Sequence, residues 1–220
     1  MSDARRFFDA IAPRYDREYA LSGHASRERM ARVDDALAAI GPAPLDVLCL
    51  GLGTGRELPS LFDAGHVPVG VEISPQMIAL CKKRRRVPHI VEADFYAPLP
   101  LRDGAFDAVL ALHGALAHPP DVDAFGALAA EISRVLRPGG ALLAEVPDGA
   151  RLSSLAGAAG DVKVSARGDV TRFEHVDPRG PRLAGVALSA AEWERRLAPR
   201  LRVRAEAIAP EELWLVATRA

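Results

Sequence analysis

The stretch Val47-Leu48-Cys49-Leu50-Gly51-Leu52-Gly53-Thr54-Gly55 is typical of a buried β-strand that breaks into a glycine turn. Four apolar residues in succession fit a strand that is covered on both faces. The alternate glycines remove the Cβ atoms from a tight bend, so that a ligand can approach the backbone closely. The next residues, 56–61, predict a helix whose N-terminal N–H groups and positive dipole end face that ligand. The stretch therefore predicts a nucleotide-type site.

The spacing of the glycines bears on which nucleotide is bound. The fingerprint of dinucleotide-binding domains is G-x-G-x-x-G. Here the third glycine, Gly55, comes one residue early, and Arg56 stands in its place. The pattern G-x-G-x-G after an apolar strand resembles motif I of the class I S-adenosylmethionine-dependent methyltransferases.

Four later segments resemble further motifs of that family, in the family's order. One apolar strand ends in Glu72 and the next ends in Asp94. Residues 106–113 then look like the family's fourth strand, and residues 136–143 look like its post-helix turn and fifth strand. The resemblance covers roughly residues 7–148 without interruption and resumes at the C-terminal end. It implies S-adenosylmethionine as cofactor and S-adenosylhomocysteine as its product.

The apolar pattern predicts an α/β fold in which helices and strands alternate, and such alternation favours a parallel sheet covered on both faces. Helices are expected at residues 4–20, 25–40, 55–64, 75–86, 121–136 and 189–197, and strands at 45–50, 67–71, 89–93, 106–112, 140–146, 202–208 and 213–218. Together with the resemblance, this predicts a Rossmann-like, doubly wound, mostly parallel seven-stranded sheet with an antiparallel last strand. An N-terminal helical cap and a β-hairpin insertion after the fifth strand complete it.

A chain of 220 residues is long enough for one α/β domain with a sizeable core. We expect a single domain made of a helical cap (1–41), a cofactor-binding core (42–148), an insertion or lid (149–185) and a last helix with a terminal strand pair (186–220). Within the insertion, residues 149–160 look small and flexible, and 161–167 with 170–176 predict the hairpin. The insertion would lie over the carboxyl edge of the sheet, where open α/β folds bind ligands.

The charge, the apolar segments and the cysteine content of the chain limit which kinds of binding partner and location are expected. A formal net charge of −1 gives no electrostatic case for nucleic acid or an anionic membrane. No segment approaches the ~20 apolar residues of a membrane span, and nothing at the N-terminus resembles a signal peptide. The two cysteines, Cys49 and Cys81, fit a reduced, cytoplasmic chain. We predict a small-molecule acceptor and no metal site; the oligomeric state stays open.

The resemblance assigns roles to residues at the ends of the strands. Gly51, Gly53 and Gly55 would lie against the methionyl part of the cofactor. Glu72 would accept from two ribose hydroxyls, which suits a carboxylate, although a nicotinamide cofactor's ribose would fit it equally. Asp94 and the Phe95 N–H would contact the adenine, with a turn cap as the alternative for Asp94. The cofactor-binding set is completed by Ile73, Leu112 and Tyr15, the last in a cap helix that resembles those of small-molecule methyltransferases.

Cys49 departs from the family's pattern, which has an acid two residues before the first glycine that helps to hold the cofactor's ammonium group. A neutral thiol is a poor acceptor and does not offset that charge. Either another acid substitutes for it, or binding is weaker, or the protein no longer catalyses. The plain alternative is that Cys49 fills space in a core strand.

The histidines after the fourth predicted strand are candidate catalytic or acceptor-binding residues. His113 could orient an acceptor or take a proton from it, or it could be structural. The acceptor pocket is expected to involve Tyr19, His118, Phe173 and His175. Tyr15 and Tyr19 have amphipathic helix packing as their alternative role.

Three functions follow from these observations. The first is transfer of the methyl group of S-adenosylmethionine to a small molecule by in-line displacement. The second is a non-catalytic protein that keeps the fold, and Cys49 is its main support. The third is a nicotinamide-dependent oxidoreductase, against which Arg56 and the terminal strand pair both count.

Overall fold

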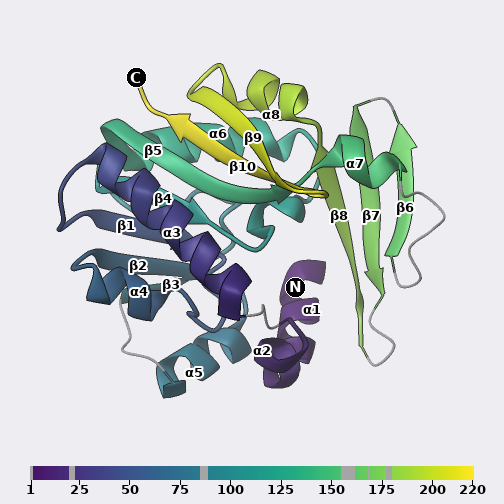
Figure 1. The fold of residues 1–220 in the computed structure, drawn as a ribbon. Coiled ribbons are helices and arrows are strands. Elements are labelled where there is room, and N and C mark those ends of the chain that lie inside the picture. The colour runs from purple at the N-terminus through teal and green to yellow at the C-terminus, as the bar shows by residue number, and fades with distance from the viewer. Residues whose placement is uncertain (1, 20–22, 85–88, 155–161, 168, 177–179) are drawn as a thin grey trace.

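The computed structural model describes residues 2–19, 23–84, 89–154, 162–167, 169–176 and 180–220 (Figure 1). Its main sheet has seven strands in the order β3-β2-β1-β4-β5-β10-β9. All neighbours are parallel except β10, which is antiparallel to both β5 and β9. The strands are β1 (Asp46–Leu50), β2 (Val67–Glu72), β3 (His89–Glu92), β4 (Phe106–Ala111), β5 (Leu136–Pro147), β9 (Arg202–Ala209) and β10 (Glu212–Thr218). The predicted Rossmann-like sheet with its antiparallel last strand is confirmed.

Helices cover both faces of this sheet, as the unbroken apolar strands predict. Alternate residues of β1 divide between two cores. Val47 and Cys49 pack with side chains of α3, α4 and α5, whereas Leu48 and Leu50 pack with those of α6 and α8. The helices are α3 (Gly23–Ile40), α4 (Leu58–Asp63), α5 (Pro75–Arg84), α6 (Ala124–Val135) and α8 (Ala190–Leu197).

The N-terminal cap is interrupted where one helix over residues 4–20 was expected. It consists of α1 (Asp3–Ile11), the 3₁₀ turn η1 (Ala12–Arg14) and α2 (Tyr15–Glu18). Pro13 lies in the turn, and because proline has no backbone N–H it cannot continue the helical hydrogen bonds. Phe7 and Ile11 of α1 pack against Met77 of α5 and against Leu183, which belongs to a second sheet. The cap thereby joins the main sheet to the insertion.

The second sheet contains the expected hairpin, formed by β6 and β7, and adds a third antiparallel strand in the order β6-β7-β8. They are β6 (Val162–Arg167), β7 (Val170–Val176) and β8 (Arg182–Leu188). The ring of Phe173 lies over Gly185, where the absence of a Cβ atom leaves room for it. The pairing extends through β8 to residue 188, so the boundary expected at residue 185 falls inside a strand.

Two boundaries near the glycine turn and the insertion also differ from expectation. The helix expected from residues 55–56 begins only at Leu58, since the left-handed Gly55 extends the turn, and it is six residues long. Its N-terminal dipole is correspondingly a smaller factor at the site. Residues 149–154, expected to be flexible, form helix α7 (Gly149–Ser154), and 155–161 lie outside the described residues. In the part of the chain that the structure describes, no helix is both long and apolar enough to cross a membrane.

Candidate functional site

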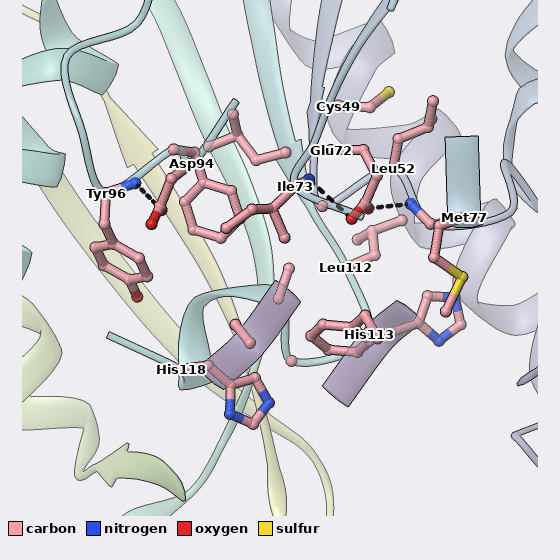
Figure 2. A pocket seen from close by; sticks show the side chains of 18 of the residues that line it. Cys49, Leu52, Glu72, Ile73, Met77, Asp94, Tyr96, Leu112, His113 and His118 are labelled. Atoms are coloured by element: carbon pink, nitrogen blue, oxygen red, sulfur yellow. Dashed lines mark hydrogen bonds between the residues drawn. The ribbon is translucent and has the colours of Figure 1, made fainter. Parts of the chain in front are cut away.

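A cavity of about 500 Å³ lies at the carboxyl ends of β1, β2 and β4 and beside the turn that follows β3 (Figure 2). Parallel strands bring these ends together at one edge, which is where open α/β sheets bind ligands. The other side of the cavity is formed by α1, by the segment after β4 that contains η2 (Ala115–Ala117), and by Leu183 and Ala184 of β8. Its size is within the range of small-molecule sites.

The three glycines of the turn have different surroundings. All have left-handed backbones, with φ of 65°, 58° and 73° at Gly51, Gly53 and Gly55. Gly51 and Gly53 line the cavity, and a Cβ atom on Gly53 would meet almost open space. A Cβ atom on Gly55 would lie 2.7 Å from both Cys81 Sγ and Leu58 Cδ1. The backbone of Gly53 therefore borders open cavity space, whereas Gly55 is required by internal packing.

Glu72, at the end of β2, is held by backbone donors. It is 4% exposed, and its carboxylate accepts hydrogen bonds from the N–H groups of Gly53 (2.7 Å), Ile73 (2.9 Å) and Ser74 (2.8 Å). Burial raises the pKa of this carboxyl, against the lowering effect of those donors. The bond to Gly53 fixes the glycine turn against β2, so the carboxylate and the turn keep a constant geometry.

Asp94, after β3, also lines the cavity, and Figure 2 shows it on the same side of the pocket as Glu72. Its Oδ1 accepts from the backbone N–H of Tyr96 at 2.9 Å. This is the turn-capping bond that was the alternative interpretation of Asp94. One bond does not exhaust a carboxylate, so the cap leaves Asp94 able to accept from a ligand as well.

Cys49 has an acidic neighbour that the sequence analysis missed. Glu57, between the glycine turn and α4, lines the cavity together with Cys49, and its Oε1 lies 2.6 Å from Nε2 of His113. Burial raises the pKa of the Cys49 thiol, and the charge of Glu57 raises it further. Burial alone would raise the pKa of Glu57 also, but the hydrogen bond and charge of His113 lower it below its ordinary value. The site thus contains a neutral thiol beside an ionised carboxylate.

A buried ion pair between Arg29 and Glu145 is hydrogen-bonded to the backbone of His113. Arg29 of α3 donates from Nε to Glu145 of β5 at 2.5 and 2.6 Å, and both residues are buried. Glu145 Oε2 also accepts from the backbone N–H of His113 at 3.1 Å. His113 has a left-handed backbone (φ 55°), which is uncommon for a residue with a side chain and is found preferentially at functional sites.

The opposite side of the cavity is aromatic and apolar. His118 lies there, across the pocket from Glu72 and Asp94 in Figure 2. Its Nδ1 is 3.0 Å from the carbonyl oxygen of Ala184, and its ring is about 6 Å from the rings of Phe8 (6.1 Å) and Phe173 (6.0 Å). A carbonyl only accepts, so Nδ1 carries the proton and a neutral ring has its lone pair on Nε2.

The other predicted site residues divide into two groups. Tyr15, Ile73, Phe95 and Leu112 line the cavity. Tyr19 is 41% exposed and stacks on Tyr15 at 5.1 Å, and Phe173 is buried behind His118, so neither is among the lining residues. The backbone of His175 lies in β7 opposite Leu183, but its side chain is outside the described ones.

The cap is fastened over the glycine turn by Asp16 of α2. Its carboxylate accepts from Thr54 Oγ1 (2.5 Å), Arg56 Nε (3.0 Å) and Arg84 Nη1 (2.5 Å). The guanidinium of Arg56 also lies 4.7 Å from the ring centre of Tyr15. Arg56, which occupies the place of the third fingerprint glycine, therefore serves to hold the cap against the turn.

This strand order, with an antiparallel β10 between β5 and β9 and a glycine turn after β1, defines the class I S-adenosylmethionine-dependent methyltransferase fold. Residues 48–144 match the family described as "Methyltransferase domain". The likeness of residues 48–144 to methyltransferase domains agrees with the family resemblance that the sequence motifs predict.

Individual methyltransferases are similar to this chain in sequence or in structure. A demethylmenaquinone methyltransferase of Thermus thermophilus is 36% identical over 144 residues, which is 62% of either chain. A 23S rRNA (guanine(748)-N(1))-methyltransferase of Streptomyces fradiae is 34% identical over 65% of this chain and 48% of its own. The crystal structure of an S-adenosylmethionine-dependent methyltransferase from Clostridium acetobutylicum has a TM-score of 0.75 at 15% identity, over 96% of this chain and 98% of the other. The demethylmenaquinone methyltransferases are matched over only 55–62% of their length.

Proposed function

We propose that this chain binds S-adenosylmethionine in the cavity and transfers its methyl group to a small-molecule acceptor. The observation that carries the proposal is the arrangement at the sheet edge: an open-faced glycine turn and, on the next two strands, the carboxylates of Glu72 and Asp94 at the cavity wall. The methyltransferase relatives supply the donor class, since both printed activities are methyl transfers.

The residues of this wall fit the parts of such a cofactor. Glu72 would accept from ribose hydroxyls and Asp94, with the Phe95 N–H, would meet the adenine, because both carboxylates line the cavity. The backbone at Gly51 and Gly53 would lie against the methionyl portion, where a side chain would take up the space. Ile73, Leu112 and Tyr15 would provide apolar contact around these polar groups.

When bound, the cofactor would supply a methyl group activated by its sulfonium sulfur: the acceptor's lone pair would bond to the methyl carbon in line with the breaking carbon–sulfur bond, and S-adenosylhomocysteine would leave. The chain's contribution is alignment and exclusion of water, as expected for an activated donor. The cap serves both, because α1 closes the cavity and Asp16 fastens α2 to the glycine turn.

Acceptors that lose a proton need a base, and two histidines of the wall are candidates. His113 binds the Glu57 carboxylate through Nε2, so its neutral ring would accept a proton at Nδ1. His118 donates from Nδ1 to Ala184, so its neutral ring would accept at Nε2. A neutral amine as acceptor would need only to be oriented.

The acceptor side favours a small molecule over RNA. It is lined by Phe8, His118, Leu183 and Ala184, with the cap over it, and no cluster of cations faces it among the described residues. The formal net charge of −1 agrees, because RNA binding relies on positive surface. A nicotinamide cofactor is disfavoured by Arg56, whose side chain holds the cap where the fingerprint needs a glycine.

Parallel calorimetric titrations with S-adenosylmethionine, S-adenosylhomocysteine and NAD test the proposal. We expect micromolar binding of the two sulfur nucleotides and none of NAD, followed by radiolabelled methyl transfer to a member of a small-molecule panel. A folded chain that binds only NAD, or neither nucleotide class, contradicts the proposal. Binding without transfer to any small molecule, but with transfer to ribosomal RNA, contradicts the proposed acceptor class alone.

A further inference from the structure

We infer that Glu57 supplies the negative charge that Cys49 lacks, and that its carboxylate receives the ammonium of the cofactor's methionyl group alongside the hydrogen bond from His113. This inference rests on the proposed function, because it concerns how S-adenosylmethionine is held in the same cavity. Glu57 is thereby a binding residue that the motif I spacing does not indicate.

The need for such a charge follows from the chemistry of the ligand. The methionyl end carries an ammonium group, and a cation taken out of water without a partner is strongly disfavoured. Cys49 is 7% exposed, and burial followed by the nearby charge of Glu57 raises the pKa of its thiol, so that it stays uncharged. A thiol is a weak acceptor. Cys49 therefore does not balance the ammonium.

Glu57 has the position and the charge for this role. It follows the glycine turn by two residues, and its side chain, 16% exposed, lines the cavity together with Cys49 and Gly53. Its negative charge also contributes to raising the pKa of the Cys49 thiol, after burial. The carboxylate of Glu57 thus lines the same cavity as the thiol whose missing charge it would supply.

The other carboxylates that line the cavity are assigned to the ribose (Glu72) and the adenine (Asp94) in the proposed function, or lie on the cap (Asp3). Glu72 already accepts three backbone N–H groups, and Asp94 accepts from Tyr96 beyond β3. Asp3 is on the cap, where its side chain is 70% exposed and pairs with Arg6. Among the described lining residues, Glu57 is the carboxylate that follows the glycine turn directly. Its hydrogen-bond partner is the side chain of His113, whereas Glu72 is bonded to backbone N–H groups.

His113 holds Glu57 without saturating it. An ionised carboxylate only accepts, so Nε2 of His113 carries the hydrogen in the 2.6 Å contact with Oε1. A carboxylate offers about four lone-pair directions, so an ammonium adds a second donor and need not displace the histidine. The left-handed backbone of His113 and its N–H bond to Glu145 keep the imidazole in place. His113 is then a positioning residue for Glu57.

Two ligands distinguish a contact between Glu57 and the ammonium group from a general disturbance of the binding site. S-adenosylhomocysteine carries the amino-acid group, whereas 5′-methylthioadenosine has the same adenosine and thioether sulfur without it. In calorimetric titrations, Glu57→Gln should weaken S-adenosylhomocysteine about 10- to 100-fold, as expected for a lost bond to a charged group. The affinity for 5′-methylthioadenosine should change less than about twofold.

Three comparisons make the test decisive. Asp94→Asn, on the adenine side, should weaken both ligands by the same factor, and the double variant Glu57→Gln with Cys49→Asp should recover affinity for S-adenosylhomocysteine. Should Glu57→Gln not fold, Glu57→Asp keeps the charge on a shorter side chain and should give a smaller loss confined to S-adenosylhomocysteine. Wild-type affinity in a folded Glu57→Gln, or equal losses for both ligands, overturns the inference. A wild-type chain that binds neither ligand contradicts the proposed function itself.

Discussion

The two sides of the cavity are built in opposite ways. The donor wall consists of the glycine turn and the ends of β2 and β3, which lie within residues 49–96, and its carboxylates are fixed by backbone N–H groups of adjacent turns. The acceptor wall combines α1, the segment after β4 and β8, which are far apart in the sequence; α1 packs on Leu183 of β8, and His118 after β4 bonds to Ala184 of β8. Hydrogen bonds to turn N–H groups thus define the donor wall, whereas contacts between distant segments assemble the acceptor wall.

This difference predicts that changes in the donor wall act on cofactor affinity, whereas changes in the acceptor wall act on turnover. The largest effect is expected at Gly53. Gly53→Val places a side chain in the cavity and forces a β-branched residue into a left-handed backbone (φ 58°). We expect binding of S-adenosylhomocysteine to fall by roughly 100-fold or more, equivalent to about 2.7 kcal/mol, measured by calorimetry.

Gly55→Val is the matched control, because its backbone is also left-handed but its Cβ atom would point into packed side chains at 2.7 Å. It should lower the melting temperature, through overpacking that typically costs about 1–3 kcal/mol. If Gly53→Val left the affinity unchanged in a folded protein, the glycine turn would not face the cofactor.

An intermediate effect is expected at the acceptor wall and separates the two histidines. His118→Ala should lower turnover about 100-fold with an acceptor that loses a proton, as expected when a general base is removed, and leave the affinity for S-adenosylhomocysteine within about twofold. His113→Ala should weaken that affinity several-fold by releasing Glu57. Kinetics and calorimetry on both variants check this, and the reverse pattern would make His113 the base.

The smallest expected effect concerns the ionisation of two buried tyrosines, Tyr15 and Tyr96. Burial raises the pKa of Tyr15, on the cap, to about 12, and burial raises that of Tyr96, beside Asp94, as well. Both phenols are thus stabilised in their neutral form by folding, a contribution that is complete below the unfolded pKa of about 10 and is lost as the pH rises toward the folded values. In an ultraviolet titration, the exposed Tyr19 should ionise first, and Tyr15 and Tyr96 should form tyrosinate only as the chain unfolds in alkali. Ionisation of all three tyrosines near pH 10 with the fold intact would refute this.

The sequence predicts the donor side of the molecule well for a physical reason. Buried parallel strands are continuous apolar runs, and a turn that bends sharply around a ligand needs glycines, so β1 and its turn can both be identified from the residues at 47–55. Glu72 and Asp94 are found in the same way, as acids that end apolar strands.

The acceptor side could not be predicted to the same degree, because it depends on contacts between distant segments. Nothing near Leu183 in the sequence shows that it packs against Phe7 of α1, and β8 follows a Gly-Pro pair that is typical of a loop. Glu57 was missed although it is only two residues beyond the glycine turn. Its signal was the combination of an absent acid at Cys49 with an unexplained acid directly after the turn.

The crystal structure of the complex with S-adenosylhomocysteine tests the division between the two walls most directly. We expect the adenine at Asp94, the ribose hydroxyls at Glu72 and the ammonium within hydrogen-bonding distance of Glu57, with the sulfur facing the side that holds His118. A ligand bound outside this cavity, or bound with its adenine on the side of His118, would contradict it.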